Sequence, residues 1–314
     1  MNFDMNQFNK DDIKCIELEL STACNLKCPL CFRTNTEIDS LYDQDFKQVK
    51  QLLKKQISNK TDTILLANIY AEPLLYKYIN ETLDYIKMLS KLFNKKVNTI
   101  LETNASYQNK EYWFKQAELS KTHNIKYVFS LCGSTQELHS KYRVNANLEK
   151  TINNIKTFIN HSASYEIILI EFKYNQKDII NYKTWDILKD IPKDKIHIMP
   201  TTMFNEMVYH KEEYSDFNSV NTFNDNIDNK ENIICPGLID STIQMAGGDS
   251  NSQHDSFYPC NLFRFIEKRP IKNTYNDIKD LYIDIYNNVY DFCRNCTKKQ
   301  QQNLLSINQD RNWL

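Results

Sequence analysis

The chain has 314 residues and a formal net charge of −1, from 39 lysines and arginines against 40 aspartates and glutamates. This balance excludes a nucleic-acid-binding protein with a strongly basic surface overall, and no apolar run is long enough to span a membrane. Only 4 residues are glycine, the first being Gly133, which excludes the glycine-rich phosphate loops of nucleotide- and dinucleotide-binding domains.

The first 200 residues alternate between short β-like runs and longer helical patterns. Apolar runs predict six strands, at 14–20, 64–70, 97–103, 126–131, 165–172 and 195–199. Helical spacing predicts a helix from Asp45, capped by Asp43 or Asp45, and further helices within 76–93 and over 110–123, 147–160 and 178–189. Such a β–α repeat implies parallel strands joined by helical crossovers, in an open sheet or a barrel.

The β–α repeat stops after residue 203. Residues 204–232 are polar and lack apolar periodicity, so we interpret them as a linker. Residues 233–298 contain two short apolar stretches, a Gly-Gly turn and a helical pattern over 277–293. The polar residues 299–314 form a tail. The predicted organisation is therefore a domain of residues 1–203, a linker, a small domain of residues 233–298 and the tail.

The cysteines fall into two groups. The polar, acidic N-terminus is no secretory signal, so we expect a cytoplasmic protein, in which clustered cysteines indicate metal rather than disulfides. Of the nine cysteines, two stand alone, at positions 15 and 132. The other seven form one group near the start, Cys24, Cys28 and Cys31, and one near the end, Cys235, Cys260, Cys293 and Cys296.

The first group lies in the segment CNLKCPLC, directly after the first predicted strand. Three thiolates can hold three irons of a four-iron cluster and leave the fourth iron open to an external ligand. A zinc site is the alternative, but it would need a distant fourth ligand. The spacing resembles the signature of radical S-adenosylmethionine (SAM) enzymes, and the resemblance covers nearly the whole chain. It implies a [4Fe-4S] cluster, SAM as cofactor and a partial (β/α)6 TIM-like barrel.

The same resemblance implies the residues that contact SAM. Ala71 and Glu72 occupy a segment that is Gly-Gly-Glu-Pro-like in the family and holds the SAM amino group, while Asn104 belongs to a Thr-Asn-Ala segment that matches Thr-Asn-Gly. Ser130 is a candidate for the ribose or methionyl end, or else a capping hydroxyl. Arg143 is a candidate partner of the SAM carboxylate, or else a solvated charge. Met199 either lines the adenine or packs in the core.

The second group of cysteines supplies four thiolates, enough to fill every protein-ligand position of a metal site. A strand, a Gly turn, a second strand, a helix and a CxxC pair resemble the Twitch domain, the shortened SPASM extension of radical SAM enzymes. The resemblance implies a small α+β domain, a β-hairpin plus helix, that holds an auxiliary [4Fe-4S] cluster; a zinc site of four cysteines is the alternative. The long loop between Cys235 and Cys260 either contacts substrate through His254 or is solvated.

Cys132 replaces the aspartate of the family's Ser-Leu-Asp-Gly segment, at the end of the fourth predicted strand. It either returns a hydrogen atom to a substrate radical or is a small buried hydrophobic residue. His197, on the sixth predicted strand, either faces the barrel or is a satisfied core histidine.

The resemblance implies reductive cleavage of SAM to a 5'-deoxyadenosyl radical and abstraction of hydrogen from a substrate. We expect a two-electron oxidation of a small polar metabolite, such as a sugar or cyclitol, supported by flavodoxin or ferredoxin as reductant.

Only about 13 residues precede the first strand, which we take as too few for a leader-peptide-binding module. Modification of a peptide or protein side chain, by oxidation or epimerisation, is the first alternative, and a non-catalytic zinc-binding interaction protein is the second. No nucleic acid or membrane partner is expected.

Overall fold

The structure, a computed structural model, describes residues 14–35, 43–66, 71–200, 242–246 and 256–258. The chain divides into two compact units. One unit comprises Glu17–Lys55 and Asp62–Asn221, and the other comprises Met1–Ile16, Gln56–Thr61 and Thr222–Leu314. Each unit is described by itself below. Within the described residues, no helix combines the length and the apolar character that a membrane span requires.

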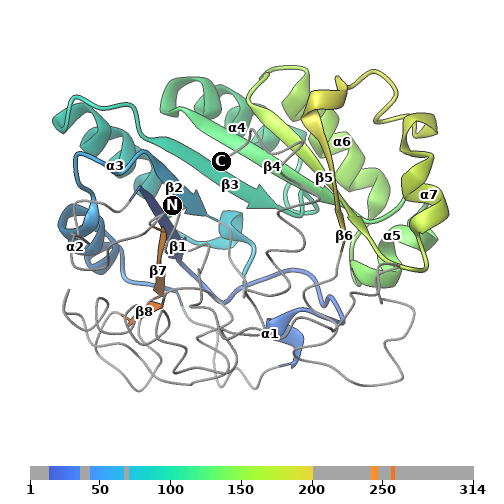
Figure 1. Cartoon of the computed structure of the whole chain (residues 1–314), viewed down its shortest axis with the longest axis horizontal. Coiled ribbons are helices and arrows are strands. Elements are labelled where there is room, and N and C mark those ends of the chain that lie inside the picture. Colours follow the sequence, from blue (N-terminus) through green and yellow to red (C-terminus); the bar gives the residue numbers. More distant parts are fainter. Residues whose placement is uncertain (1–13, 36–42, 67–70, 201–241, 247–255, 259–314) are drawn as a thin grey trace, which may run out of the picture. The chain divides into compact units, whose positions relative to one another are not determined.

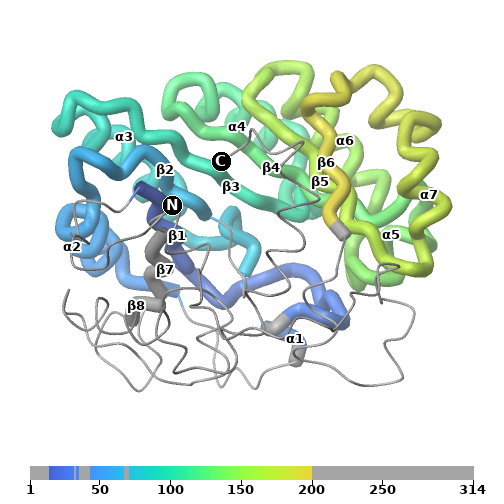
Figure 2. The backbone as a smooth tube through the Cα atoms, in the orientation of Figure 1, coloured from blue at the N-terminus to red at the C-terminus, as the bar shows by residue number. Residues whose placement is uncertain are grey.

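Six strands of the predicted β–α repeat lie side by side in chain order. They are β1 (Cys15–Glu19), β2 (Thr63–Leu66), β3 (Asn98–Thr103), β4 (Ile125–Leu131), β5 (Tyr165–Glu171) and β6 (Ile196–Pro200). The sheet order is β6-β5-β4-β3-β2-β1, and each pair from β2 to β6 is parallel. Figure 2 shows this order as a tube whose colour changes steadily from blue to yellow across the sheet. The fold is the expected open α/β sheet, a partial TIM-like barrel.

Helices connect the strands and cover one face of the sheet (Figure 1). The α-helices are α1 (Phe32–Asn35), α2 (Phe46–Gln56), α3 (Ile79–Leu92), α4 (Lys110–His123), α5 (Gln136–Tyr142), α6 (Leu148–Ile159) and α7 (Gln176–Ile180). Three short 3-10 turns are η3 (Pro73–Leu75), η4 (Tyr182–Thr184) and η5 (Lys193–Lys195). Of the two predicted caps of α2, Asp45 is the one observed, because its Oδ1 accepts from the backbone N–H of Lys47 at 2.8 Å.

The strand register separates two faces of the sheet. Leu101, Tyr127 and Tyr165 pair across β3, β4 and β5 and are buried beneath the helices. There Trp113 of α4 packs edge-on against Tyr127, with 6.3 Å between ring centroids. The next residues along the strands pair in the same way and face the opposite, inner side of the sheet, where Glu102 is exposed. On this inner face, Val128, Ile168 and Ile170 are buried as well, so its exposure is uneven along the strands.

Between the later strands, one predicted helix was wrong and one observed helix was missed. The predicted helix over 178–189 is observed only as α7, which ends at Ile180, followed by the turn η4. Asn181 and Thr184 are poor helix formers, and Trp185 is buried here in an irregular segment. The helix α5 was not predicted, because its seven residues are too few to establish an apolar period.

In the second unit the structure describes a β-hairpin. Strands β7 (Thr242–Ala246) and β8 (Ser256–Tyr258) pair antiparallel, with Met245 opposite Phe257. The two strands agree with the two strands predicted for the small domain, and the Gly-Gly turn between them lies outside the described residues. The predicted boundaries at 203, 232 and 298 lie outside the described residues and stay predictions.

Candidate active site

The three N-terminal cysteines lie on the loop between β1 and α1. The backbone N–H of Cys31 donates to the carbonyl of Cys28 at 3.0 Å, and the N–H of Leu26 lies 3.5 Å from the Cys24 sulfur. Leu26 and Cys28 are buried against Ala146, and Tyr142 packs beside them. The loop is therefore held in a defined conformation by the segment that follows α5.

The chemistry of these thiols suits a metal cluster. Burial raises the pKa of Cys24 to about 11 and also raises the pKa of Cys31, so the metal-free thiols are protonated and metal binding must release protons. No three ligand side chains among the described residues surround a point where a single ion would sit. A zinc ion needs every sulfur at about 2.3 Å, whereas in a four-iron cluster each thiolate binds a different iron. Three thiols on one loop fit the cluster.

Glu72 connects the loops that follow β2 and β3. Its side chain is 2% exposed, and its two oxygens accept from the Thr103 hydroxyl at 2.6 Å and from the Asn104 N–H at 2.9 Å. Burial raises the pKa of this carboxyl to about 7 despite these hydrogen bonds. Ala71 precedes it, partly buried, and the Glu72 N–H donates to the carbonyl of Ala23 next to Cys24. Glu72 thus fixes three loops at the same edge of the sheet.

Asn104 links the end of β3 to the cysteine loop. Its side-chain amide donates to Asn25 Oδ1 at 3.1 Å and lies 4.0 Å from the Cys24 sulfur. The oxygen of the same side chain accepts from the N–H and hydroxyl of Ser106, and Asn25 in turn donates to Ser106 at 2.8 Å. This network places Asn104 beside the first cysteine, as a cofactor-binding residue would need.

Ala105 occupies a backbone conformation that favours glycine. Its φ is 53°, in the left-handed region, and its side chain is completely buried. Its N–H donates to the Thr103 hydroxyl, and its carbonyl accepts from the side chain of Asn154 at 2.9 Å. The surrounding hydrogen bonds hold the alanine in this conformation.

Ser130 and Arg143 lie together beside the cysteine loop. Arg143 donates through Nη2 to the Ser130 hydroxyl and through Nη1 to the Cys28 sulfur at 3.8 Å. Its Nε is buried without a hydrogen-bond partner in the described part of the chain. Arg143 is therefore no solvated surface charge, and the sequence interpretation of that kind is wrong. The Ser130 hydroxyl also approaches the carbonyl of Thr103, at 3.5 Å.

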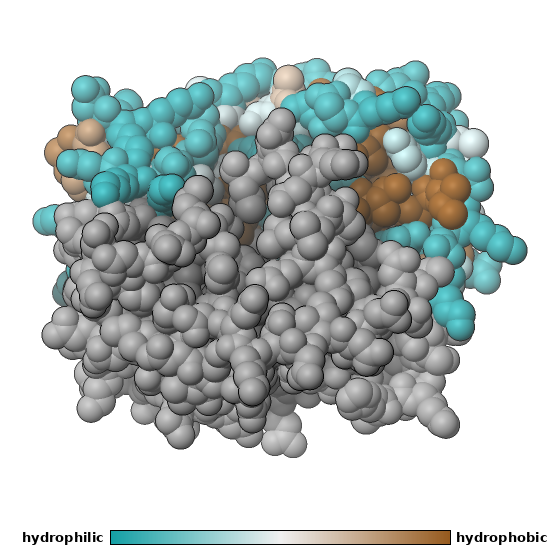
Figure 3. All heavy atoms as spheres, in the orientation of Figure 1, coloured by the Kyte–Doolittle hydropathy of each residue, from teal (hydrophilic) through white to brown (hydrophobic). Residues whose placement is uncertain are grey.

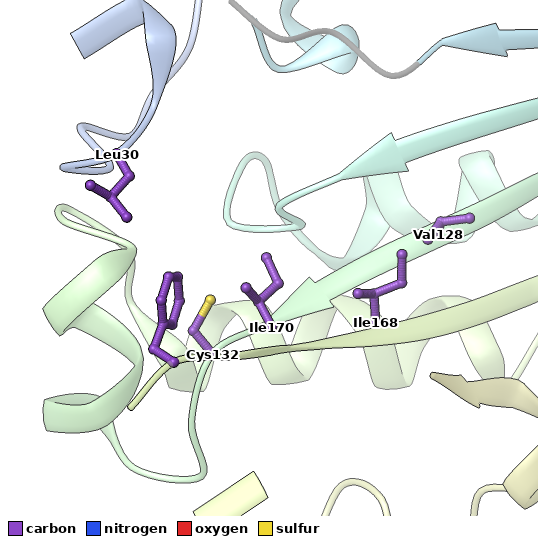
Figure 4. Close-up of a cluster of buried hydrophobic side chains, with 6 residues drawn as sticks. Leu30, Val128, Cys132, Ile168 and Ile170 are labelled. Atoms are coloured by element: carbon purple, nitrogen blue, oxygen red, sulfur yellow. The ribbon is translucent and has the colours of Figure 1, made fainter. Parts of the chain in front are cut away.

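Cys132 lies in a buried apolar cluster at the end of β4. Its side chain is completely buried among Leu30, Ile170 and Phe172, and Figure 4 shows it beside Ile170 with Leu30 on a separate loop. Burial raises the pKa of this thiol to about 11. The surroundings are mostly apolar, but the charged side chain of Arg143 also interacts with this thiol. Both interpretations of Cys132, a small buried hydrophobic residue and a hydrogen-atom donor, stay hypotheses.

Two residues that the sequence analysis missed hold the loop after β4. His139 is 1% exposed, its Nδ1 lies 3.3 Å from the Cys132 N–H, and burial lowers its pKa to about 3, so the ring is a neutral acceptor. Asn175, also 1% exposed, donates to the carbonyls of Cys132 and Ile170 and accepts from the Phe172 N–H. An isolated histidine or asparagine carries no sequence signal for such a role.

Met199 and His197, two further residues singled out from the sequence, both lie on strand β6. Met199 on β6 is 40% exposed, so it is not a core residue, and it pairs in register with Ile170 on the inner face. Neighbouring Ile198 and Ile180 are exposed too, and Figure 3 shows apolar side chains at the surface where β6 and α7 lie. His197 lies 3.6 Å from Glu166 on that inner face. The side chains His254, Cys235, Cys260, Cys293 and Cys296 lie outside the described residues.

Known proteins resemble this chain over half to two thirds of its length. A cysteine-type anaerobic sulfatase-maturating enzyme of Clostridium novyi (strain NT) is 27% identical over 170 residues, which cover 52% of this chain and 42% of that enzyme. The structure of native anSMEcpe with bound AdoMet has a TM-score of 0.53 at 14% identity, covering 65% of this chain and 55% of that one. The same protein with bound AdoMet and the Kp18Cys peptide gives 0.52 at 15%.

These matches are partial. The chain spans about half the length of the solved structures and less of the curated relative, and at this identity the solved structures speak for the fold alone. No family model matches the chain.

The fold and the site together define the class of protein. A parallel β–α sheet carries a CxxxCxxC loop directly after its first strand, as the motif of radical SAM enzymes requires. Together with the sulfatase-maturating relative, this makes the chain similar to radical SAM enzymes.

Proposed function

We propose that this protein binds a [4Fe-4S] cluster through Cys24, Cys28 and Cys31 and cleaves SAM reductively to start a radical reaction on a substrate. The observation that carries the proposal is the cysteine loop itself, held beside Asn104, Ser130 and Arg143 at the end of the sheet. The solved structure of anSMEcpe with bound AdoMet supports SAM as the ligand.

Residues beside the cysteine loop would contact the different parts of SAM. Asn104 and the loop of Ala71 and Glu72 lie next to Cys24 and would contact the methionyl amino group. Arg143, with Ser130, would pair with the carboxylate, because the buried Nε retains an unused donor. Met199 would pack against the adenine from β6.

When bound, the reduced cluster and SAM supply a one-electron cleavage that yields a 5'-deoxyadenosyl radical, which takes hydrogen from the substrate. The inner face of the sheet would orient that substrate. Exposed Glu102 and partly buried Ser130 are two of the polar groups on that face that could position it. Flavodoxin or ferredoxin remains the proposed electron donor.

The second group of cysteines would bind an auxiliary [4Fe-4S] cluster in a Twitch-like domain. The antiparallel pair of β7 and β8 supports this, since two strands are expected between Cys235 and Cys260. Four thiolates close a cluster, so its role would be electron transfer rather than substrate binding.

The substrate class that the comparisons favour is a peptide or protein side chain. The curated relative matures sulfatases, and anSMEcpe has been solved with a peptide bound. The small polar metabolite expected from the sequence gains no support from these relatives. Oxidation of a side chain is therefore the leading form of the proposal, and oxidation of a metabolite is the alternative.

Anaerobic reconstitution tests the proposal. We expect about eight irons per chain, two clusters' worth, and formation of 5'-deoxyadenosine from SAM with dithionite as reductant. The triple variant Cys24→Ala, Cys28→Ala, Cys31→Ala should keep the auxiliary irons and lose all 5'-deoxyadenosine. Bound zinc without SAM cleavage would contradict the proposal. Incubation with a cysteine-containing sulfatase peptide, followed by intact-mass measurement, separates the two substrate classes.

A further inference from the structure

We propose that Arg143 is a positioning residue that raises the reduction potential of the cluster bound by Cys24, Cys28 and Cys31, through a hydrogen bond to the Cys28 sulfur. The inference rests on the proposed function, because it requires a cluster on those cysteines. It adds a role that is separate from the binding of SAM, since it acts on the cluster before SAM arrives.

The backbone places Arg143 at the cysteine loop. The Lys27 N–H donates to the carbonyl of Val144 at 3.1 Å, so the residue after Arg143 is bonded to the residue before Cys28. Arg143 caps the end of α5 through a bond from its own N–H to the carbonyl of His139, and the Ala146 N–H donates to the Arg143 carbonyl, each at 2.9 Å. The side chain therefore starts from a fixed point next to the cluster ligands.

The guanidinium is also fixed in orientation. Nη2 donates to Ser130, which is anchored on β4, while Nη1 points at the Cys28 sulfur, 3.8 Å away. The group lies 5.5 Å from the ring centre of Tyr142, which packs against the cysteine loop. One planar group thus joins a strand to a cluster ligand, which a flexible lysine could not do as well.

The positive charge of Arg143 determines in which direction the reduction potential of the cluster would shift. Reduction adds one electron, supplied by an external low-potential donor, and makes the cluster more negative. A fixed cation and an N–H donor at a ligand sulfur stabilise the reduced form more than the oxidised form, which raises the potential. Cys28 is only 6% exposed, so water screens this interaction weakly.

The same loop offers a matched control. Arg33 carries the same charge and also contacts the cysteine loop, but it donates to carbonyls, that of Thr22 at 2.9 Å and that of Leu26 at 3.5 Å. It makes no hydrogen bond to a cysteine sulfur through its side chain in the described structure. A comparison of Arg143→Gln with Arg33→Gln therefore separates a hydrogen bond to sulfur from a general effect of charge.

The test is a potentiometric titration of the reconstituted full-length protein without SAM, using titanium(III) citrate and following the cluster by electron paramagnetic resonance. The N-terminal cluster is recognised as the signal that is absent from the triple cysteine variant. We expect Arg143→Gln to make its potential more negative by about 59 mV, a tenfold change for one electron. Ser130→Ala, which frees the guanidinium but keeps the charge, should shift it less in the same direction, and Arg33→Gln, which removes a charge but no hydrogen bond to sulfur, should also shift it less than Arg143→Gln does.

Several outcomes would overturn the inference. An unchanged potential in Arg143→Gln with a fully assembled cluster would do so, as would an equal shift in Arg33→Gln. If Arg143→Gln does not fold, an unchanged potential in Ser130→Ala overturns the inference instead. A wild-type protein that assembles no cluster on the three cysteines would overturn the proposed function as well, so the two failures can be distinguished.

Discussion

At the scale of single residues, the structure explains how a glycine-poor chain makes turns. Among the described residues, five that are not glycine have positive φ, and three of them are the asparagines Asn94, Asn124 and Asn145. Asparagine tolerates this region better than most residues. Gly133 is kept for a different reason, because a Cβ there would lie 2.5 Å from the Cβ of Leu138. At Gly133, space rather than φ requires glycine.

Ala105 is the exception that can be tested. Its left-handed φ costs about 1–2 kcal/mol, which Ala105→Gly would recover, while loss of the buried methyl and a more flexible unfolded chain oppose the gain. We expect the free energy of unfolding to stay unchanged or rise by up to about 1 kcal/mol. The control Ala117→Gly, equally buried but within α4, should lower it by about 1 kcal/mol. Urea denaturation measures both, and equal losses would contradict the strain at Ala105.

His139 should make stability depend on pH. Its pKa is lowered from 6.5 to about 3, so the unfolded chain takes up a proton that the folded protein does not. The stabilising contribution of neutral His139 is therefore fully present above about pH 6.5 and is lost as the pH falls toward 3, by at most about 1.4 kcal/mol per pH unit.

The variant His139→Asn keeps an acceptor for the Cys132 N–H without titrating. Its free energy of unfolding should fall less steeply than that of the wild type between pH 6.5 and 4.5, as measured by urea denaturation at each pH. Parallel curves for the two proteins would show that His139 is not the group responsible.

At the scale of elements, the loops at the carboxyl ends of the strands are joined by buried polar side chains. Glu72 joins the loops after β2 and β3, Asn104 joins those after β3 and β1, and Asn175 joins those after β5 and β4. The site is thus built by cross-links between neighbouring loops rather than by any one loop.

A variant of Asn175 tests whether these buried side chains stabilise the protein by joining neighbouring loops. Asn175→Ala removes two donated bonds and one accepted bond from groups that stay buried, so we expect a loss of about 2–4 kcal/mol in the free energy of unfolding. Asn181→Ala, which removes one exposed bond to the Lys177 carbonyl, should change it by less than about 1 kcal/mol. Thermal denaturation compares the two variants, and similar losses would argue against a cross-linking role.

At the scale of the whole molecule, the sequence predicted what is local and missed what is tertiary. Alternating apolar residues located the strands, and the cysteine spacing located the centre of the site. Ser130 and Arg143 were identified separately, but only the structure shows them bonded to each other and Arg143 to Cys28. The helix over 178–189 was over-predicted, because apolar side chains such as Trp185 are buried without a helix. Buried His139 and Asn175 carry no periodic signal at all.

The two groups of cysteines should be separable in the full-length protein. Alanine at Cys235, Cys260, Cys293 and Cys296 should leave about four irons per chain and preserve reductive formation of 5'-deoxyadenosine, since the N-terminal loop is built within the sheet unit. Oxidised product should disappear, because in the proposed function the auxiliary cluster accepts the electron that leaves the substrate. Iron analysis and product chromatography check this. Full product formation would remove the auxiliary cluster from the mechanism.

The bond between the cysteine loop and the segment after α5 also has a consequence for biosynthesis. Cys28 and Arg143 are 115 residues apart in sequence, yet the loop is held by that distant segment. A contact between residues so far apart in sequence forms slowly during folding, because the long chain segment between them must first be closed into a loop. On the ribosome, the cysteines emerge long before the residues that hold them. Under the proposed function, iron and sulfide delivered early would meet cysteines that the segment after α5 does not yet hold, so loading of the cluster is expected after translation has passed α5.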